Sequence, residues 1–135
     1  MPKNEHFDRL YELLEKVHDG HESPSKTEDI PKVSDQLAAY ILWLDVDPLI
    51  PERTYSILLD TQSTTVQVTD LSFKIDAKTH SQLAAKKLFQ NEYGYCKLSL
   101  GQKVSFDAYS ESQIKGSFEI FDSLNNSIVG IGLID

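Results

Sequence analysis

Residues 66–75, with the sequence VQVTDLSFKI, decide the fold class of this chain. Apolar and polar residues alternate along this stretch with a period of two, which is the pattern of a β-strand with one buried face. The apolar residues stand at even positions before Thr69 and at odd positions after Asp70. A strand whose buried face changes sides in this way needs a bulge or a sharp bend, and we expect one at these two residues.

The flanking sequence contains more short segments of this kind, separated by turn clusters such as residues 122–126. The stretch 37–44 is almost continuously apolar, which suits a buried strand. Only residues 81–88 leave room for a helical turn. The expected strands are 37–44, 55–59, 66–75, 95–100, 104–106, 118–121 and 127–134. Six or seven short strands predict an all-β barrel or sandwich.

A segment with a different period precedes these strands. Its apolar side chains recur at helical spacing and form one stripe, made of Phe7, Leu10, Tyr11, Leu14 and Val17. We therefore expect an N-terminal amphipathic helix in residues 1–20, a polar linker in residues 21–30 and the barrel domain in residues 31–135. The stripe either folds back over the barrel or pairs with a second copy of the chain. We favour folding back in a monomer, with a homodimer through the helix as the alternative.

The composition excludes several classes of partner. The chain has 135 residues and a net charge of −8 at pH 7, and residues 1–30 carry −4 of that charge. Such an acidic protein is a poor match for nucleic acid. A single cysteine, Cys96, excludes an internal disulfide, and no apolar run reaches the roughly 18 residues of a membrane span. With no secretory signal visible, we expect a cytoplasmic protein that does not bind membranes.

No catalytic or cofactor-binding constellation stands in the sequence. There is no phosphate-binding P-loop, and the Gly-x-Gly at 130–132 has no helix after it. The four histidines are scattered over the expected helix, linker and loops, so we expect no metal site. Cys96 faces inward on its strand and is expected to be a small buried hydrophobe. Turn and solubility roles are expected for the acidic residues Asp45, Asp47 and Asp76. These residues predict a non-enzymatic β-domain without a cofactor.

Several short motifs occur in a fixed order over residues 31–134. They are SDQLAA at 34–39, WL at 43–44 with PLIP at 48–51, LAAK at 83–86, NExG at 91–94, FDxY at 106–109, GxF at 116–118 and NxIVGxGxI at 126–134. In this order they resemble the C-terminal β-barrel domain of the large, GTP-binding subunit of bacterial sulfate adenylyltransferase. The last motif is similar, more loosely, to the third domain of elongation factor Tu. The resemblance implies a six-stranded antiparallel Greek-key barrel of the translation-factor type.

The resemblance also implies a limited function. In that family a P-loop domain carries the GTPase activity, a separate small subunit adenylylates sulfate, and the barrels hold the assembly together. We expect this chain to have neither the P-loop domain nor the middle barrel. We therefore expect a free-standing, non-catalytic interaction module that binds a protein partner. The alternative is an accessory subunit of a sulfate-activating complex, with the small adenylyltransferase subunit as its partner.

Seven residues are candidate partner contacts, five from the helical stripe and two from the matching motifs: Phe7, Leu10, Tyr11, Leu14, Val17, Glu92 and Tyr109. Fold maintenance is the competing interpretation of the motif residues, in which Tyr109 fills the core and the glycines serve turns or close strand packing. The sequence also departs from the family pattern. Glu52 stands where the family usually has glycine, and Gln62 stands where it has a basic residue.

Overall fold

A computed structural model describes residue 10, residue 12, residues 32–109, residue 112 and residues 115–135. The strands are β1 (Lys32–Trp43), β2 (Thr54–Leu59), β3 (Gln62–Ile75), β4 (Gln82–Leu83), β5 (Tyr93–Phe106), β6 (Ser117–Phe121) and β7 (Ile128–Ile134). The predicted helix in residues 1–20 and the linker fall almost wholly outside the described residues, so both stay predictions. In the described part of the chain, no helix has the length and apolar character needed to cross a membrane.

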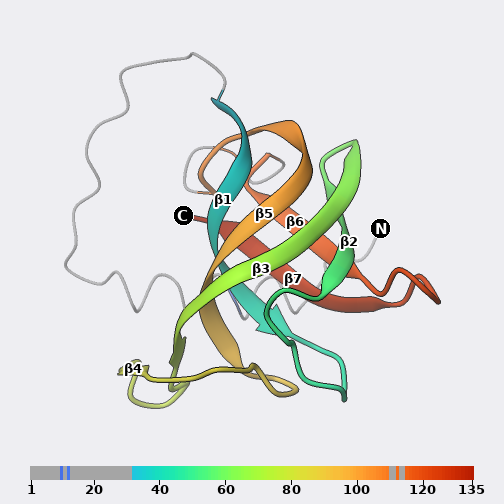
Figure 1. Ribbon diagram of the computed structural model, residues 1–135. Coiled ribbons are helices and arrows are strands. Elements are labelled where there is room, and N and C mark those ends of the chain that lie inside the picture. The colour runs from blue at the N-terminus through green and yellow to red at the C-terminus, as the bar shows by residue number, and fades with distance from the viewer. Residues whose placement is uncertain (1–9, 11, 13–31, 110–111, 113–114) are drawn as a thin grey trace.

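Six of the strands close into an antiparallel barrel (Figure 1). The order around it is β2-β6-β7-β1-β5-β3, and pairing between β2 and β3 closes the ring. The two-residue β4 stands outside this ring and pairs with the end of β3. Strand β1 lies between β5 and β7, so the barrel joins strands that are far apart in the sequence. The all-β, six-stranded antiparallel barrel is therefore confirmed.

The phase change in β3 is confirmed as well. The pairing of β3 with β5 shifts register between Val68 and Asp70, where the alternation predicts a bulge. Val66 and Val68 lie in the barrel interior on one side of this irregularity, and Leu71 lies there on the other. A second register shift, between Leu71 and Phe73, reverses the phase again. The expectation that Phe73 and Ile75 face inward with Leu71 is therefore wrong, and both belong to a cluster on the outside of the barrel.

Two glycines of β7 make room for the two bulkiest fully buried side chains, Trp43 and Phe118. Gly130 pairs with Trp43, and a Cβ at Gly130 would lie 3.0 Å from the indole. Gly132 pairs with Phe118, and a Cβ there would overlap the phenyl ring. The indole is also held by a 2.7 Å hydrogen bond that its Nε1–H donates to the carbonyl of Asp47. Close strand packing is thus the role of both glycines.

Two further local expectations are wrong. Residues 81–88 do not form a helical turn, but contain β4 and a single bridge between Leu49 and Leu88. Just before them, the Asp76 carboxylate accepts hydrogen bonds from the backbone N–H groups of Lys78 and Thr79. This turn directs the chain back along β3. The expected separate strands 95–100 and 104–106 are one continuous strand, β5, because its C-terminal part pairs with the start of β1.

One of the two departures from the family pattern has a structural explanation. Glu52 has φ 75°, in the left-handed region that favours glycine, and nothing in the structure explains a glutamate there. The side-chain amide of Gln62, at the start of β3, forms two hydrogen bonds with the end of β5. Its Oε1 accepts from the Ser105 backbone N–H and its Nε2 donates to the Ser105 carbonyl, both at 2.8 Å. A basic side chain has no acceptor for that N–H, so glutamine is the residue that completes the pair.

Replacing Gln62 with alanine is expected to lower the free energy of unfolding by about 1–2 kcal/mol, because it leaves two partly buried backbone groups without partners. Urea denaturation followed by Trp43 fluorescence measures the change. The matched control is Gln67→Ala, which removes an exposed hydrogen bond to the Thr54 hydroxyl and is expected to cost less than about 0.5 kcal/mol. Equal losses for the two variants would contradict this role of Gln62.

Candidate functional site

A second cluster of buried apolar side chains lies on the outside of the barrel. In β1 the side chains of Ala39, Ile41 and Trp43 belong to the interior core, whereas the alternate residues Tyr40 and Leu42 belong to the second cluster. We call the barrel's contribution to this cluster the outer face; it consists of Tyr40, Leu42, Ile75, Tyr93, Ile131 and Leu133. The outer face spans β7, β1, β5 and the end of β3, which are neighbours in the barrel. Apolar side chains that are buried on the outside of a barrel have to be shielded from water by another segment of protein.

Leu10 covers part of the outer face. This side chain precedes the barrel by more than 20 residues, belongs to the second cluster and is only 1% exposed. Glu12, the other described residue of the N-terminal segment, is exposed. A segment that folds back with its apolar stripe toward the barrel buries Leu10 and exposes Glu12 in this way. Phe7, Tyr11, Leu14 and Val17 lie outside the described residues, and their contacts stay predictions.

Three aromatic rings pack together at the rim of the outer face, where Tyr95 is stacked on Phe73 and tilted against Tyr40. The ring of Tyr95 lies 4.8 Å from that of Tyr40 and 5.3 Å from that of Phe73, and its hydroxyl donates a 3.1 Å hydrogen bond to the Asp135 carboxylate. Burial, together with the nearby Asp135, raises the pKa of Tyr40 and of Tyr95 to about 12. Both hydroxyls therefore stay protonated at neutral pH and act as hydrogen-bond donors rather than as bases.

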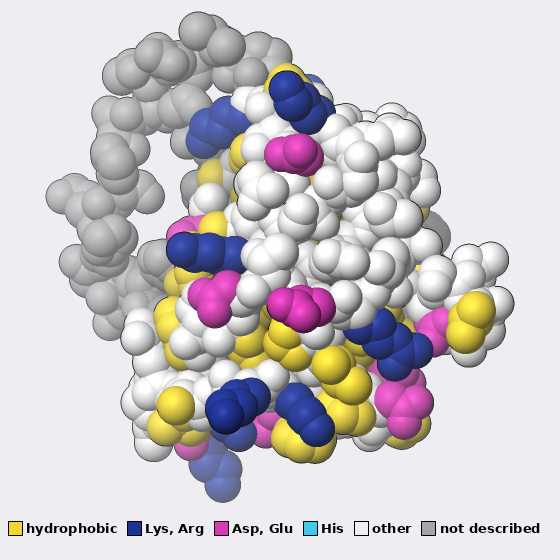
Figure 2. Space-filling model, viewed as in Figure 1, with side chains coloured by type: hydrophobic (Ala, Val, Ile, Leu, Met, Phe, Trp, Pro, Cys, Tyr) yellow, Lys and Arg dark blue, Asp and Glu magenta, His cyan; other side chains and the backbone are white. Residues whose placement is uncertain are grey.

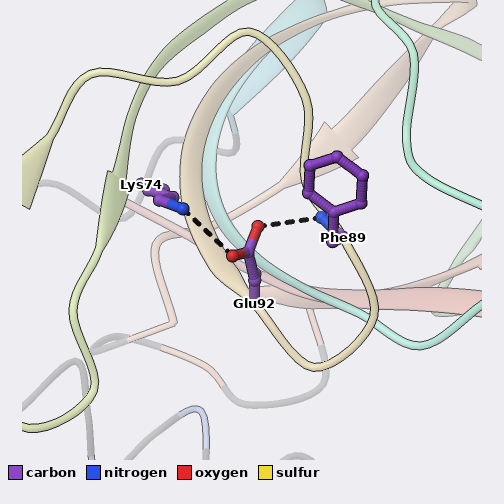
Figure 3. A network of polar contacts seen from close by, with 3 residues as sticks. All are labelled: Lys74, Phe89 and Glu92. Atoms are coloured by element: carbon purple, nitrogen blue, oxygen red, sulfur yellow. Dashed lines mark hydrogen bonds and ion pairs between the residues drawn. The ribbon is translucent and has the colours of Figure 1, made fainter.

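Glu92, a candidate partner contact, is engaged within its own chain (Figure 3). One carboxylate oxygen accepts from the Phe89 backbone N–H at 2.9 Å, and the other forms a 3.0 Å ion pair with Lys74. Because each side chain is about 30% exposed, this ion pair stabilises the fold only modestly. The geometry makes Glu92 a brace between β3 and the loop before β5, and its role as a partner contact stays a prediction.

Tyr109, the other motif residue, packs at the edge of the second cluster and is partly buried. Its backbone N–H donates to the Ile134 carbonyl at 2.9 Å. A Cβ on Gly116 would overlap the Tyr109 backbone, so this loop and the start of β6 are in close contact. These contacts favour the interpretation of Tyr109 as a residue that maintains the fold.

Exposed apolar side chains gather at the end of the barrel where β3 ends and β5 begins. Phe89 is 52% exposed, Ile50 is 41% exposed and Leu83 is 39% exposed. At its lower end, Figure 2 shows yellow hydrophobic side chains next to dark blue Lys and Arg side chains. The sequence pattern did not mark these three residues as one exposed apolar group. The available signal was the LAAK motif followed by Lys87, Leu88 and Phe89, which places apolar and basic residues in one loop.

The described residues offer no centre for catalysis. Cys96 is fully buried, as expected, and burial, with a smaller contribution from Asp70, raises the pKa of its thiol to about 12. No three His, Cys, Asp or Glu side chains gather as metal ligands within the part of the chain that the structure describes. The Asp76 carboxylate accepts hydrogen bonds from the backbone N–H groups of Thr79 and Lys78 in a turn, and these bonds lower its pKa.

The fold and these contacts define a barrel domain of the kind found in translation factors. Residues 36–135 match the family model described as GTP-eEF1A C-terminal domain-like. The chain belongs to this family.

Several curated proteins share the domain. The bifunctional enzyme CysN/CysC of Xylella fastidiosa is 39% identical over 109 residues, which are 81% of this chain and 18% of that protein. The bifunctional enzyme NodQ of Rhizobium sp. strain BR816 is 38% identical over 78% of this chain and 17% of its own length. Sulfate adenylyltransferase subunit 1 of Aeromonas salmonicida is 38% identical over 77% of this chain and 22% of its own length. The chain thus matches about a fifth of these relatives.

Among solved structures, the barrel is similar to Sup35 complexed with GDP, with a TM-score of 0.71 over 81% of this chain and 27% of that one. The sequence identity is 18%, so this likeness concerns the fold alone. The resemblance to the C-terminal domain of sulfate adenylyltransferase subunit 1, expected from the ordered motifs, is confirmed by the family model and the curated relatives.

Proposed function

We propose that this chain is a non-catalytic β-barrel interaction module that binds a protein partner in the cytoplasm. The observation that carries the proposal is the outer face, a second apolar cluster on the outside of the barrel that takes up Leu10. A barrel that contacted no other segment would need only its interior core. A buried apolar exterior is typical of a domain that docks against further protein.

Two further observations support this function. The matched region is only 16–22% of its curated relatives, so in those proteins the domain has a long chain around it. In this chain, burial raises the pKa of Tyr40, Tyr95 and Cys96 to about 12. A group that does acid–base or nucleophilic work needs a pKa near the working pH. A role in assembly fits these properties better than a role in chemistry.

The second candidate function is that of an accessory subunit of a sulfate-activating complex. Its support is the identity of 38% to sulfate adenylyltransferase subunit 1 of Aeromonas salmonicida, a protein whose name places it in such an enzyme. The expected partner is then the small adenylyltransferase subunit. Co-elution of the two purified proteins at low micromolar concentration would support this function, and separate elution would contradict it.

The proposal of an interaction module is tested by affinity capture of the tagged full chain from its native lysate, with mass-spectrometric identification of what is retained. We expect one protein to be enriched in stoichiometric amount over a tag-only control. The purified candidate must then form a complex of defined mass in size-exclusion chromatography with light scattering. A chain that retains nothing above the control, at concentrations where transient complexes form, does not act as an interaction module.

A further inference from the structure

The exposed end of the barrel combines large apolar side chains with lysines. We define the Phe89 patch as Ile50, Lys78, Leu83, Lys86, Lys87 and Phe89. All six residues are exposed, and they come from the loop before β2, from β4 and from the loops on either side of β4. A surface hollow of about 370 Å³ adjoins the patch and is lined by the end of β3, by Leu83 and by the start of β5.

Packing of the barrel turns Phe89 outward but does not require an aromatic side chain at this position. Its neighbour Leu88 is fully buried, bridges Leu49 and contacts the position of Gly94. Because side chains alternate along an extended segment, burying Leu88 turns Lys87 and Phe89 outward together. An aromatic side chain that is half exposed costs solubility, and aromatic residues of this kind are enriched where proteins dock.

The loop holds Phe89 in a defined position. The Glu92 carboxylate accepts from the Phe89 backbone N–H at 2.9 Å, and the Phe89 carbonyl accepts from the Glu92 N–H at 3.0 Å. Asn91 completes this tight turn with φ 68°. A side chain presented on a braced turn loses little conformational freedom when a partner binds, which favours binding.

The segment that carries Phe89 has a charge opposite to that of the whole chain and of the neighbouring loop. Loop 44–53, which contributes Ile50, holds three acidic residues and one arginine. Residues 74–92 hold four lysines and two acidic residues, a net charge of +2, while the chain carries −8. Both acidic side chains are engaged locally: Glu92 pairs with Lys74, and Asp76 accepts from two backbone N–H groups. Among the described residues, Lys74 is the only lysine of this end that forms an ion pair. The other three, Lys78, Lys86 and Lys87, are exposed and form no ion pair within the described residues, although Lys78 is near enough to Asp76 to help lower the pKa of that carboxyl.

We infer that the Phe89 patch is the docking surface for an acidic segment of a partner protein that also carries large apolar residues. This inference rests on the proposed function and specifies its contact surface. Phe89, Leu83 and Ile50 bury the apolar side chains of the segment, and the three exposed lysines of the patch pair with its carboxylates. The lysines steer the encounter and select the charge of the partner, while the apolar contacts supply most of the affinity.

The test uses the full chain and a short fluorescein-labelled synthetic peptide made of Glu, Asp, Leu and Phe, with binding measured by fluorescence anisotropy. The charge variant is Lys78→Ser/Lys86→Ser/Lys87→Ser, and its matched control is Lys97→Ser/Lys103→Ser/Lys115→Ser, three exposed lysines elsewhere. The apolar variant is Phe89→Ser, matched by Leu124→Ser in the turn between β6 and β7, where Leu124 is 88% exposed. A peptide with Lys in place of every acidic residue is the control probe.

We expect each patch variant to weaken binding of the acidic peptide by about tenfold or more, and each matched control to change it less than about twofold. Binding should weaken with added salt, and the basic peptide should not bind. Equal losses in patch and control variants, preference for the basic peptide, or no binding at all would overturn the inference. So would patch variants that convert a dimer into a monomer, because a second copy would then occupy the patch.

The outcome for the surface is separable from the outcome for the function. A protein captured equally well by wild type and by both patch variants shows that the module works through another surface, so the inference fails and the proposed function stands. A captured protein that is lost in the patch variants and retained in the matched controls supports both.

Discussion

Replacing Gly132 with alanine lowers the free energy of unfolding by about 2–3 kcal/mol, near the upper end of what overpacking a core costs. A Cβ at this position overlaps three atoms of the Phe118 ring. That ring is 1% exposed and cannot move away without displacing the rest of the interior. Urea denaturation followed by Trp43 fluorescence measures the loss.

Two controls separate overpacking from a general intolerance of alanine in strands. Gly101→Ala is expected to cost less than about 0.5 kcal/mol, because its Cβ meets the hydroxyl of exposed Thr65, which can rotate away. Shortening the ring in the double variant Gly132→Ala/Phe118→Leu should recover part of the loss, so that the combined effect is smaller than the sum of the single effects. Additive losses would show that Gly132 is not needed to seat the ring.

Replacing Leu10 with aspartate releases the N-terminal segment from the outer face. Leu10 is 1% exposed in an apolar cluster, and a charge there has no partner among the described residues of that cluster. The free energy that holds the segment on the barrel should fall by at least about 2 kcal/mol, the lower limit for deleting a buried leucine. Proteolysis within residues 1–31 should then be about 30-fold faster, because cleavage follows the population of the open state.

The barrel itself should stay folded in this variant, with a lower melting temperature and stronger binding of a dye that reports exposed apolar surface. Glu12→Ala is the matched control, since Glu12 belongs to the same segment and is exposed; it should leave both readouts unchanged. The molecular mass in solution should be that of a monomer in both variants. A wild-type dimer that becomes a monomer in Leu10→Asp would show that the stripe pairs with a second copy instead.

Much of the barrel was predictable because its strands encode their buried faces locally. A period of two marks which side chains face inward, and a change of phase marks a bulge, so residues 66–75 predicted the irregularity between Val68 and Asp70. The possible helical turn at 81–88 does not form, because the backbone there pairs with β3 and, at Leu88, with Leu49. Pairing between distant segments competes with a single helical turn and leaves no trace in the apolar pattern.

The candidate site was less accessible to sequence reasoning. Leu10 was predicted as part of an apolar stripe, and its burial on the outer face required the tertiary structure. Glu92 was marked by a motif, yet its use as a brace for Lys74 and Phe89 depends on atoms that only folding brings together. The exposure of Phe89 follows from the bridge between Leu49 and Leu88, a pairing of residues far apart in the chain.

The sequence by itself determined the all-β class, the positions of most strands and most of the inward residues, because each depends on near neighbours in the chain. The tertiary structure alone decided the order of strands, the attachment of β4, the need for glycine beside Trp43 and Phe118, the apolar exterior that includes Leu10 and the exposed lysines beside Phe89. These features depend on contacts between distant segments, whose free energies are set by packing and not by local pattern. The stretch 66–75 illustrates both contributions. Its alternation of apolar and polar residues predicts the bulge, and the tertiary structure places Ile75 in the outer face.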